Sequence, residues 1–137
     1  MNKKYTESEL QAETAIFFDK MAERLSDAHV IICRAGASTI AEILTTGRPA
    51  IYVPYPDAKD DHQTKNAESV VKSGAGIMIL QDKFTAEHLS QKLIELLNNQ
   101  ERLISMAKAA QQISIPNANE KLTDLVEVTI NGGSGKI

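Results

Sequence analysis

Cysteine, tryptophan and long apolar runs are scarce or absent in this sequence of 137 residues. Cys33 is the only cysteine, and there is no tryptophan. A disulfide framework is therefore excluded, and a reducing compartment fits the single thiol. No apolar run approaches the roughly 20 residues that a membrane-spanning helix needs. The two lysines near the amino terminus have no apolar stretch behind them, which does not fit a signal peptide.

A surplus of positive charge is also lacking. The chain has 15 basic and 18 acidic residues and a formal net charge of -3. Nucleic acid is therefore not an expected partner. With 42% hydrophobic and 24% charged residues, the composition is that of a soluble globular protein. We expect one domain over residues 1–130, followed by a flexible tail, "NGGSGKI", over 131–137.

Short apolar runs alternate along the chain with longer helical patterns. Runs flanked by glycine or proline predict buried strands at 29–33, 49–54 and 76–80, and 12–17 is a fourth candidate strand. Apolar residues at helical spacing predict helices at 17–28, 38–47, 61–74, 85–97, 100–113 and 118–130. Gly47 is the predicted cap at the end of one helix and Thr85 the predicted cap at the start of another. This alternation predicts an α/β fold, a partial Rossmann-like parallel sheet flanked by helices.

The stretch "CRAGASTIAEI" (33–43) lies where the first of these strands gives way to a helix. Gly36 is expected to let the chain turn sharply, and small neighbours let a ligand come close. Amides at a helix start on the carboxyl edge of a parallel sheet form an anion site. This interpretation assigns a phosphate or diphosphate to the backbone of Gly36, Ala37, Ser38 and Thr39. The alternative is an ordinary turn in which Thr39 and Glu42 form a capping box.

A second polar stretch, "PYPDAKDDHQTKNA" (54–67), follows the next strand and reaches the same edge of the sheet. It places side chains suited to sugar hydroxyls at a helix start: His62, Gln63 and Asn66. One alternative is a metal site formed by Asp57, Asp60, Asp61 and His62, although that spacing matches no common metal motif. The other alternative is that Asp60 and Asp61 only cap the helix and complement its dipole.

Taken together and in this order, the polar stretches resemble one family. The motifs are "FFDKM" (17–21), "AHVIICRAGASTIAEI" (28–43), "GRPAIYVPYP" (47–56), "DDHQTKNA" (60–67) and "SIPNANEKLTDLV" (114–126). They resemble the carboxyl-terminal half of the MurG family, bacterial GT-B glycosyltransferases that add N-acetylglucosamine to undecaprenyl-linked muramyl-pentapeptide. The resemblance covers about residues 10 to 130. It implies a fold that is the donor-binding half of a GT-B enzyme.

The resemblance also implies a role for each matching residue in binding UDP-GlcNAc. Residues Phe18 to Met21 lie by the uracil, and Gly36 to Thr39 meet the diphosphate. Glu42 accepts hydrogen bonds from the ribose hydroxyls. His62 and Gln63 hold the GlcNAc hydroxyls. The resemblance implies no metal and no cofactor, because a helix dipole takes the metal's place beside the diphosphate.

The chain departs from the family pattern by what it lacks. The amino-terminal half with its acceptor loops has no counterpart here, nor does the Gly-Gly-Ser-rich donor-phosphate turn. We therefore expect a fragment of an inverting glycosyltransferase that is inactive alone and whose general base lies in the other half. It would act on the cytoplasmic face of the bacterial inner membrane as a peripheral protein. We also expect an uncovered sheet edge that favours a homodimer.

Two other functions remain open at this point. One is a non-catalytic or decayed nucleotide-sugar-binding fragment, and the other is the donor subunit of a two-chain GlcNAc transferase. Among single residues, Cys33 is expected to be a small core residue, since no partner base is visible. Arg34 is expected either to approach the diphosphate or to form a structural ion pair.

Overall fold

The computed structural model describes residue 5 and residues 7–114 of the chain. At its centre lies a parallel sheet of three short strands in the order β1-β2-β3. The strands are β1 (Ile31–Cys33), β2 (Ala50–Tyr52) and β3 (Gly76–Met78). Ala50 of β2 lies opposite Ile31 on one side and Gly76 on the other, so all three strands are in register. The predicted α/β fold with a parallel sheet is therefore confirmed.

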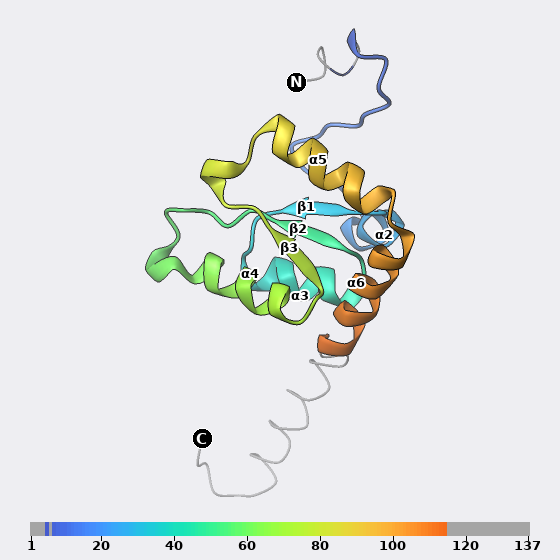
Figure 1. Ribbon diagram of the computed structural model, residues 1–137. Helices are drawn as coiled ribbons and strands as arrows, with labels where there is room; N and C mark the ends of the chain where they lie inside the picture. Colours follow the sequence, from blue (N-terminus) through green and yellow to red (C-terminus); the bar gives the residue numbers. More distant parts are fainter. Residues whose placement is uncertain (1–4, 6, 115–137) are drawn as a thin grey trace, which may run out of the picture.

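Five helices surround this sheet in the described part of the chain. They are α2 (Met21–Asp27), α3 (Ala37–Thr46), α4 (His62–Lys72), α5 (Ala86–Leu97) and α6 (Gln100–Ile113), with short 3-10 turns η1 (Lys59–Asp61) and η2 (Gln81–Lys83). Helices α3 and α4 connect successive strands and lie on one face of the sheet, while α5 covers the other (Figure 1). Crossovers of one hand that step in one direction along a sheet place their helices on the same face. None of the described helices is long and apolar enough to cross a membrane.

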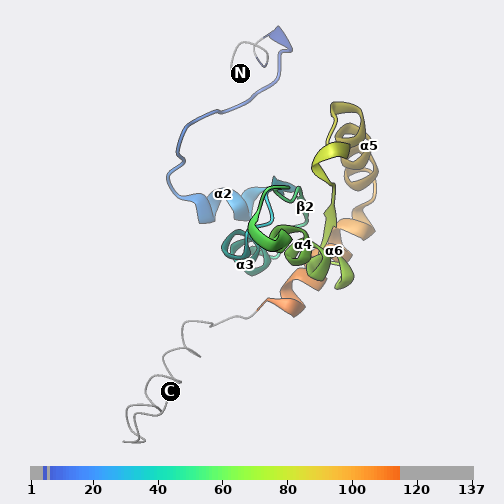
Figure 2. The same ribbon diagram turned by 90° about the vertical axis from the view of Figure 1, so that its left-hand side faces the viewer.

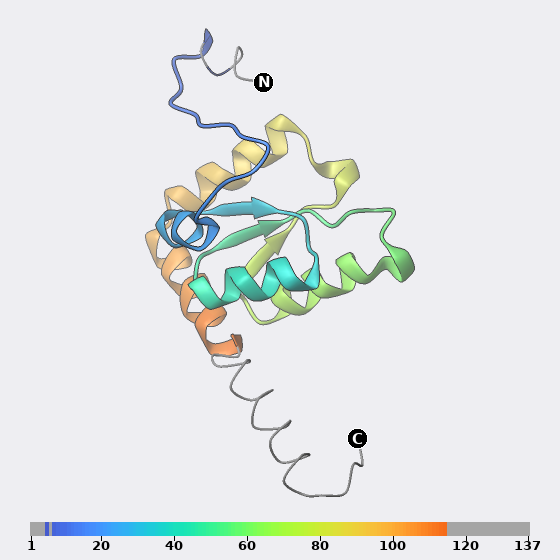
Figure 3. The same cartoon turned by 180° about the vertical axis from the view of Figure 1, so that it is seen from behind.

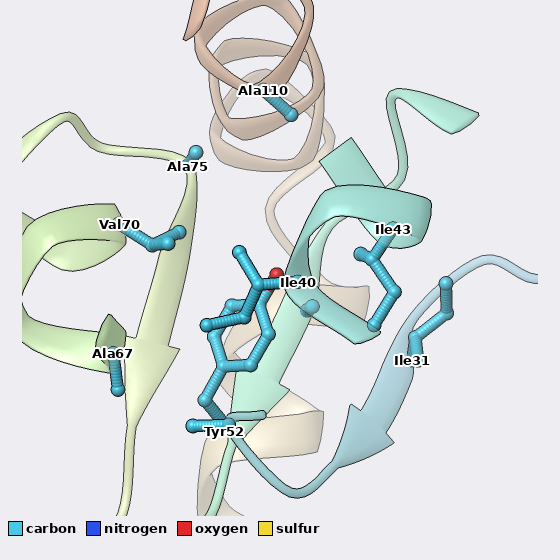
Figure 4. Close-up of a cluster of buried hydrophobic side chains, with 10 residues drawn as sticks. Ile31, Ile40, Ile43, Tyr52, Ala67, Val70, Ala75 and Ala110 are labelled. Carbon is cyan, nitrogen blue, oxygen red and sulfur yellow. The ribbon is translucent and has the colours of Figure 1, made fainter. Parts of the chain in front are cut away.

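The two faces of the sheet have separate cores. The larger core lies under α3 and α4 and contains Ile40, Ile43, Tyr52 and Val70 (Figure 4). The smaller core lies under α5 and contains Ile51, Ile79, Leu96 and Met106. Helix α6 contributes to both cores, with Met106 in the smaller one and Ala110 in the larger one. It therefore joins the two faces at the end of the sheet opposite the loops that follow the strands (Figure 3).

Several predicted boundaries hold and others are wrong. Gly47 ends α3 with a left-handed backbone (φ 66°), and Thr85 accepts a hydrogen bond from the amide of His88 at the start of α5, so both predicted caps are confirmed. The strand predicted at 12–17 is absent, because no neighbouring strand offers this segment hydrogen-bond partners. The helix predicted from residue 17 begins only at Met21. The helix predicted at 118–130 and the tail at 131–137 lie outside the described residues.

Candidate functional site

The turn after β1 leads directly into α3. Gly36 is the N-cap, with φ -65° and ψ 144°, and no side chain caps the helix start. The first amides of a helix have no acceptor within it, so those of Ala37, Ser38 and Thr39 are available to a ligand. The capping box proposed for Thr39 and Glu42 is wrong, because α3 begins two residues before Thr39. The helix start keeps the geometry of an anion site.

The conformation of Gly36 corrects one expectation. Its φ of -65° is open to any residue, so the turn does not need a glycine for its backbone. What the glycine provides is space: a Cβ added there would lie no closer than 3.9 Å to Thr39 Oγ1 and 4.0 Å to Gln63 Nε2. Gly36 thus leaves room for a ligand to approach the backbone.

Gln63 connects the loops that follow β1 and β2. Its side-chain oxygen accepts hydrogen bonds from the amide of Tyr55 at 2.8 Å and from the amide of Ala35 at 3.3 Å. Asn66, one turn further along α4, donates through Nδ2 to the carbonyl of Ala35 at 3.2 Å. The sequence predicted that Gln63 and Asn66 reach the same edge of the sheet as the turn after β1, and the structure places both beside Ala35 in that turn. The hydrogen bonds from these side chains to the backbone were not predictable from the sequence, because no pattern within residues 62–66 identifies their partners.

His62 and the acidic residues before it lie at the rim of the same edge. The imidazole Nε2 of His62 is 3.8 Å from Asp60 Oδ2, and both side chains are exposed. Asp61 occupies the N-cap of α4 but forms no side-chain cap hydrogen bond, because its backbone is left-handed (φ 55°). The predicted capping is therefore confirmed only in position, since Asp61 is the N-cap residue but provides no side-chain hydrogen bond. The predicted complement to the helix dipole stays a prediction. Over residue 5 and residues 7–114, no three His, Cys, Asp or Glu side chains come together as a metal site.

Arg34 spans the carboxyl ends of all three strands. Its Nη1 donates to the carbonyl of Val53 at 3.3 Å and also hydrogen-bonds the side chain of Gln81, which follows β3. Its guanidinium carbon lies 5.6 Å from the centroid of the Tyr55 ring. The expected structural ion pair is not formed among the described residues, where the partners of Arg34 are carbonyl and amide oxygens and a ring. Approach of Arg34 to a diphosphate stays a prediction. The residue organises the loops that border the site.

A groove of about 420 Å³ lies between α2 and α3. It is lined by Met21, Ala22 and Leu25 of α2 and by Ala41, Glu42, Thr45 and Thr46 of α3. Most of the surface that lines the groove is apolar, and Glu42 contributes a carboxylate to it. Glu42 follows Ser38 by four residues, so the two residues lie on the same side of α3. The groove and the available amides thus lie along one helix.

Phe18 and Cys33 complete the predicted residues. Phe18 lies in the irregular segment before α2, half-buried, with its ring against the guanidinium of Arg24 at 4.4 Å. The predicted nucleotide-binding residues thus lie in three places: this segment, the groove, and the edge with the start of α3.

Cys33 is partly buried and packs against the larger core. Burial raises the pKa of its thiol to about 11, so the thiol stays protonated and unreactive at neutral pH.

Comparison with known proteins gives a consistent picture. Residues 1–125 match the family described as the glycosyltransferase family 28 C-terminal domain. The UDP-N-acetylglucosamine–N-acetylmuramyl-(pentapeptide) pyrophosphoryl-undecaprenol N-acetylglucosamine transferase of Erythrobacter litoralis is 46% identical over 127 residues, covering 93% of this chain and 32% of the relative. The transferase of the same name in Paramagnetospirillum magneticum is 45% identical over 131 residues, covering 96% of this chain and 35% of the relative.

The fold agrees with a solved structure of the same kind. The crystal structure of MurG from Acinetobacter baumannii superposes with a TM-score of 0.77 at 42% sequence identity, covering 86% of this chain and 34% of that one. The chain spans about a third of the length of the relatives it matches. The family match, the sequence relatives and the shared fold agree. The chain therefore belongs to the glycosyltransferase family 28 C-terminal domain family and matches part of the carboxyl-terminal half of MurG.

Proposed function

We propose that the chain is the UDP-GlcNAc-binding part of an inverting N-acetylglucosaminyltransferase. The full enzyme would make the lipid-linked disaccharide-pentapeptide precursor of peptidoglycan. The observation that supports this best is the arrangement along α3, where a helix start without a side-chain cap is followed one turn later by Glu42 in an apolar groove. A nucleoside diphosphate has its phosphates, ribose and base in the same order. Glu42 lies about 6 Å from Ser38 along the helix axis, a separation that suits the step from diphosphate to ribose.

The UDP part of the donor binds along α3. The diphosphate accepts hydrogen bonds from the amides of Ala37, Ser38 and Thr39 and complements the helix dipole. The Glu42 carboxylate accepts hydrogen bonds from the two ribose hydroxyls. Met21 and the backbone near Phe18 flank the uracil. The apolar lining of the groove suits the flat face of a base.

The GlcNAc part of the donor binds at the start of α4. Because the Gln63 side-chain oxygen is occupied by two backbone amides, its Nε2 is the atom offered to a GlcNAc hydroxyl. Asn66 donates to Ala35 and keeps its side-chain oxygen as an acceptor. His62 lies at the exposed rim and adds a ring nitrogen. These three residues offer both donors and acceptors, as hydroxyl recognition requires.

The reaction would be inverting transfer onto undecaprenyl-linked muramyl-pentapeptide. An acceptor hydroxyl attacks the anomeric carbon of GlcNAc while the bond to UDP breaks. Negative charge grows on the leaving diphosphate, and preorganised amides at the start of α3 stabilise it. We place the general base and the acceptor pocket outside the described residues. The lipid-linked acceptor places the enzyme at the cytoplasmic face of the bacterial inner membrane, as a peripheral protein.

A second candidate is a nucleotide-sugar-binding fragment without transfer activity, or a donor subunit that works with a second chain. The observation behind it is that the residues brought together along α3 and at the start of α4 suit donor binding alone. Both candidates bind the same donor at the same residues. They differ only in transfer, which the last experiment below measures.

Calorimetric titration of the 137-residue chain with UDP and UDP-GlcNAc tests donor binding. We expect a dissociation constant above about one micromolar, because one helix start supplies the phosphate contacts. Glu42→Gln should weaken UDP binding by about 1–3 kcal/mol, the scale of a lost charged hydrogen bond, with little change in melting temperature.

Glu95→Gln on α5 is the matched control and should change nothing, since α5 lies on the opposite face of the sheet (Figure 2). Sub-micromolar affinity would contradict the expected weakness. Unchanged UDP affinity in Glu42→Gln would contradict the ribose role.

A further inference from the structure

Four contacts converge on the guanidinium of Arg24, which lies on α2. Its Nη1 and Nη2 donate to the two carboxylate oxygens of Glu13, at 2.9 Å and 2.8 Å. Its Nε donates to the carbonyl of Asp19 at 3.4 Å. Its central carbon lies 4.4 Å from the centroid of the Phe18 ring. We call these four residues the Arg24 cluster.

Three parts of the planar Arg24 guanidinium make these contacts. One edge of the guanidinium forms a bidentate pair with the carboxylate, Nε reaches the carbonyl, and the flat face lies on the ring. A lysine ammonium lacks both the planar fork and the stacking face, so the arrangement is specific to arginine. The hydrogen bond from Arg24 also lowers the pKa of the Glu13 carboxyl.

The segment that these contacts hold lacks regular secondary structure. It contains no helix or strand between residues 10 and 20. The side chain of Phe17 is 80% exposed and that of Ile16 is fully exposed, so they bury little apolar surface. Lys20, which leads into α2, has a left-handed backbone (φ 56°), a conformation that costs energy for a residue other than glycine. The contacts of Arg24 with Glu13, Phe18 and Asp19 therefore contribute to the order of the segment.

The position of the segment gives it a consequence for binding. Phe18 lies three residues before Met21, which starts α2 and lines the groove. Met21 is both the first residue of α2 and part of the groove wall, so a change in the path of 13–19 reaches the groove through Met21. Figure 2 shows this segment leading into α2. Under the proposed function, the uracil lies beside the backbone near Phe18, which belongs to this segment.

We infer that Arg24 is a positioning residue that holds segment 13–19 in the shape that recognises the base of the bound nucleotide. The inference rests on the proposed function for its ligand, a uracil nucleotide. It goes beyond that function by assigning base selectivity to a side chain outside the groove lining. Glu13 and Arg24 act through the backbone of the segment and touch no part of the nucleotide.

The exposure of the pair decides what kind of effect to expect. The side chains of Arg24 and Glu13 are 44% and 65% exposed, so solvent screens their attraction and the whole fold depends little on it. Loss of the cluster should loosen a local segment without lowering the melting temperature. Its effect should therefore appear in base recognition and not in phosphate binding.

The experiment compares the full chain with Arg24→Lys, which keeps the charge and removes the fork and the stacking face. Hydrogen exchange of the amides of 13–20 reports the order of the segment. Calorimetry with UDP, CDP and inorganic pyrophosphate separates base recognition from phosphate binding. Arg102→Lys on α6 is the matched control, and Glu13→Gln tests the partner side chain.

We expect Arg24→Lys to speed exchange at 13–20 and to lower UDP affinity by about fivefold, with the preference for UDP over CDP reduced. Pyrophosphate affinity and melting temperature should stay unchanged. Glu13→Gln should shift UDP affinity in the same direction by less, and Arg102→Lys should match the parent chain. Unchanged exchange and an unchanged UDP-to-CDP ratio in Arg24→Lys would overturn the inference.

Two other results of this experiment would each overturn one part of the inference. An equal fall in UDP and pyrophosphate affinity would show that Arg24 supports the whole site and would overturn its role in base recognition. Absence of UDP binding by the parent chain would overturn the proposed function and with it the nucleotide part of this inference. Exchange at 13–20 would then still decide whether Arg24 orders the segment.

Discussion

At the scale of the residue, Tyr52 is the most unusual member of the core. It is fully buried, and its hydroxyl has no hydrogen-bond partner among the described residues (Figure 4). A buried hydroxyl without a partner keeps its desolvation cost, so removing it costs nothing or stabilises the fold. We predict that Tyr52→Phe leaves the free energy of unfolding unchanged or raises it by up to about 1 kcal/mol in urea unfolding. Tyr55→Phe, at an exposed site, is the control, and a clear loss in Tyr52→Phe would show that the hydroxyl is satisfied.

Cys33 gives a prediction about pH. Burial raises the pKa of its thiol from 9.0 to about 11, so the folded chain holds this proton more tightly than the unfolded chain. The stability that this provides is complete below pH 9.0 and is lost as the pH rises toward 11. We predict that the free energy of unfolding falls more steeply between these values in the parent chain than in Cys33→Ala. Parallel curves for the two proteins, measured by urea unfolding at several pH values, would contradict the buried thiol.

At the scale of the element, β2 and β3 approach each other closely at one glycine. A Cβ added to Gly76 would lie 2.7 Å from Cε2 and 3.0 Å from Cδ2 of the Tyr52 ring. Because the ring is buried against α3 and α4, it has little room to move. We predict that Gly76→Ala lowers the free energy of unfolding by about 1–3 kcal/mol, the usual cost of overpacking.

Gly36→Ala is the control for this substitution. Its added Cβ would meet nothing closer than 3.9 Å, and its φ of -65° suits alanine. Stability should therefore change little there. Equal losses of stability at both positions would mean that steric space does not decide the outcome.

The same elements show what the sequence allows and what it does not. The strands and the helices α3 to α6 were predictable because short apolar runs and helical spacing depend on local residues. Segment 12–17 reads as a strand but forms none, since a strand needs a neighbour that no local pattern reveals. The shared edge of Gly36, Gln63 and Asn66 followed from parallel topology alone. The backbone partners of Gln63 and the cluster around Arg24 were not predictable, because they depend on loops folded from distant parts of the chain.

At the scale of the whole molecule, the sheet has two open edges among the described residues. β1 and β3 each pair only with β2, and Ile32 on β1 is 41% exposed. Unpaired strand edges and exposed apolar side chains favour association with other chains. We predict that the chain forms a homodimer or larger species at micromolar concentration, seen by light scattering after size-exclusion chromatography.

Ile32→Lys is the variant that tests this association. It places a charge on the β1 edge and should shift the chain toward monomer without loss of helix content in circular dichroism. Val71→Lys on α4, also at an exposed apolar position, serves as the control. A parent chain that is monodisperse and monomeric would contradict association through the sheet edge.

Transfer activity distinguishes the two candidate functions at the same scale. In the proposed function, the site along α3 would bind the donor and stabilise the leaving diphosphate, whereas transfer also needs a base and an acceptor pocket. We predict that the 137-residue chain alone incorporates no radiolabelled GlcNAc into lipid-linked muramyl-pentapeptide. Addition of the amino-terminal half of a relative should restore some incorporation if the chain is the donor part of a split enzyme, and none if it is a binding fragment. Glu42→Gln, added in place of the parent chain, should reduce any restored activity, because the donor site belongs to this chain. Transfer of GlcNAc by the unaided chain would overturn the division of labour between the two halves, since the base would then have to lie within these residues.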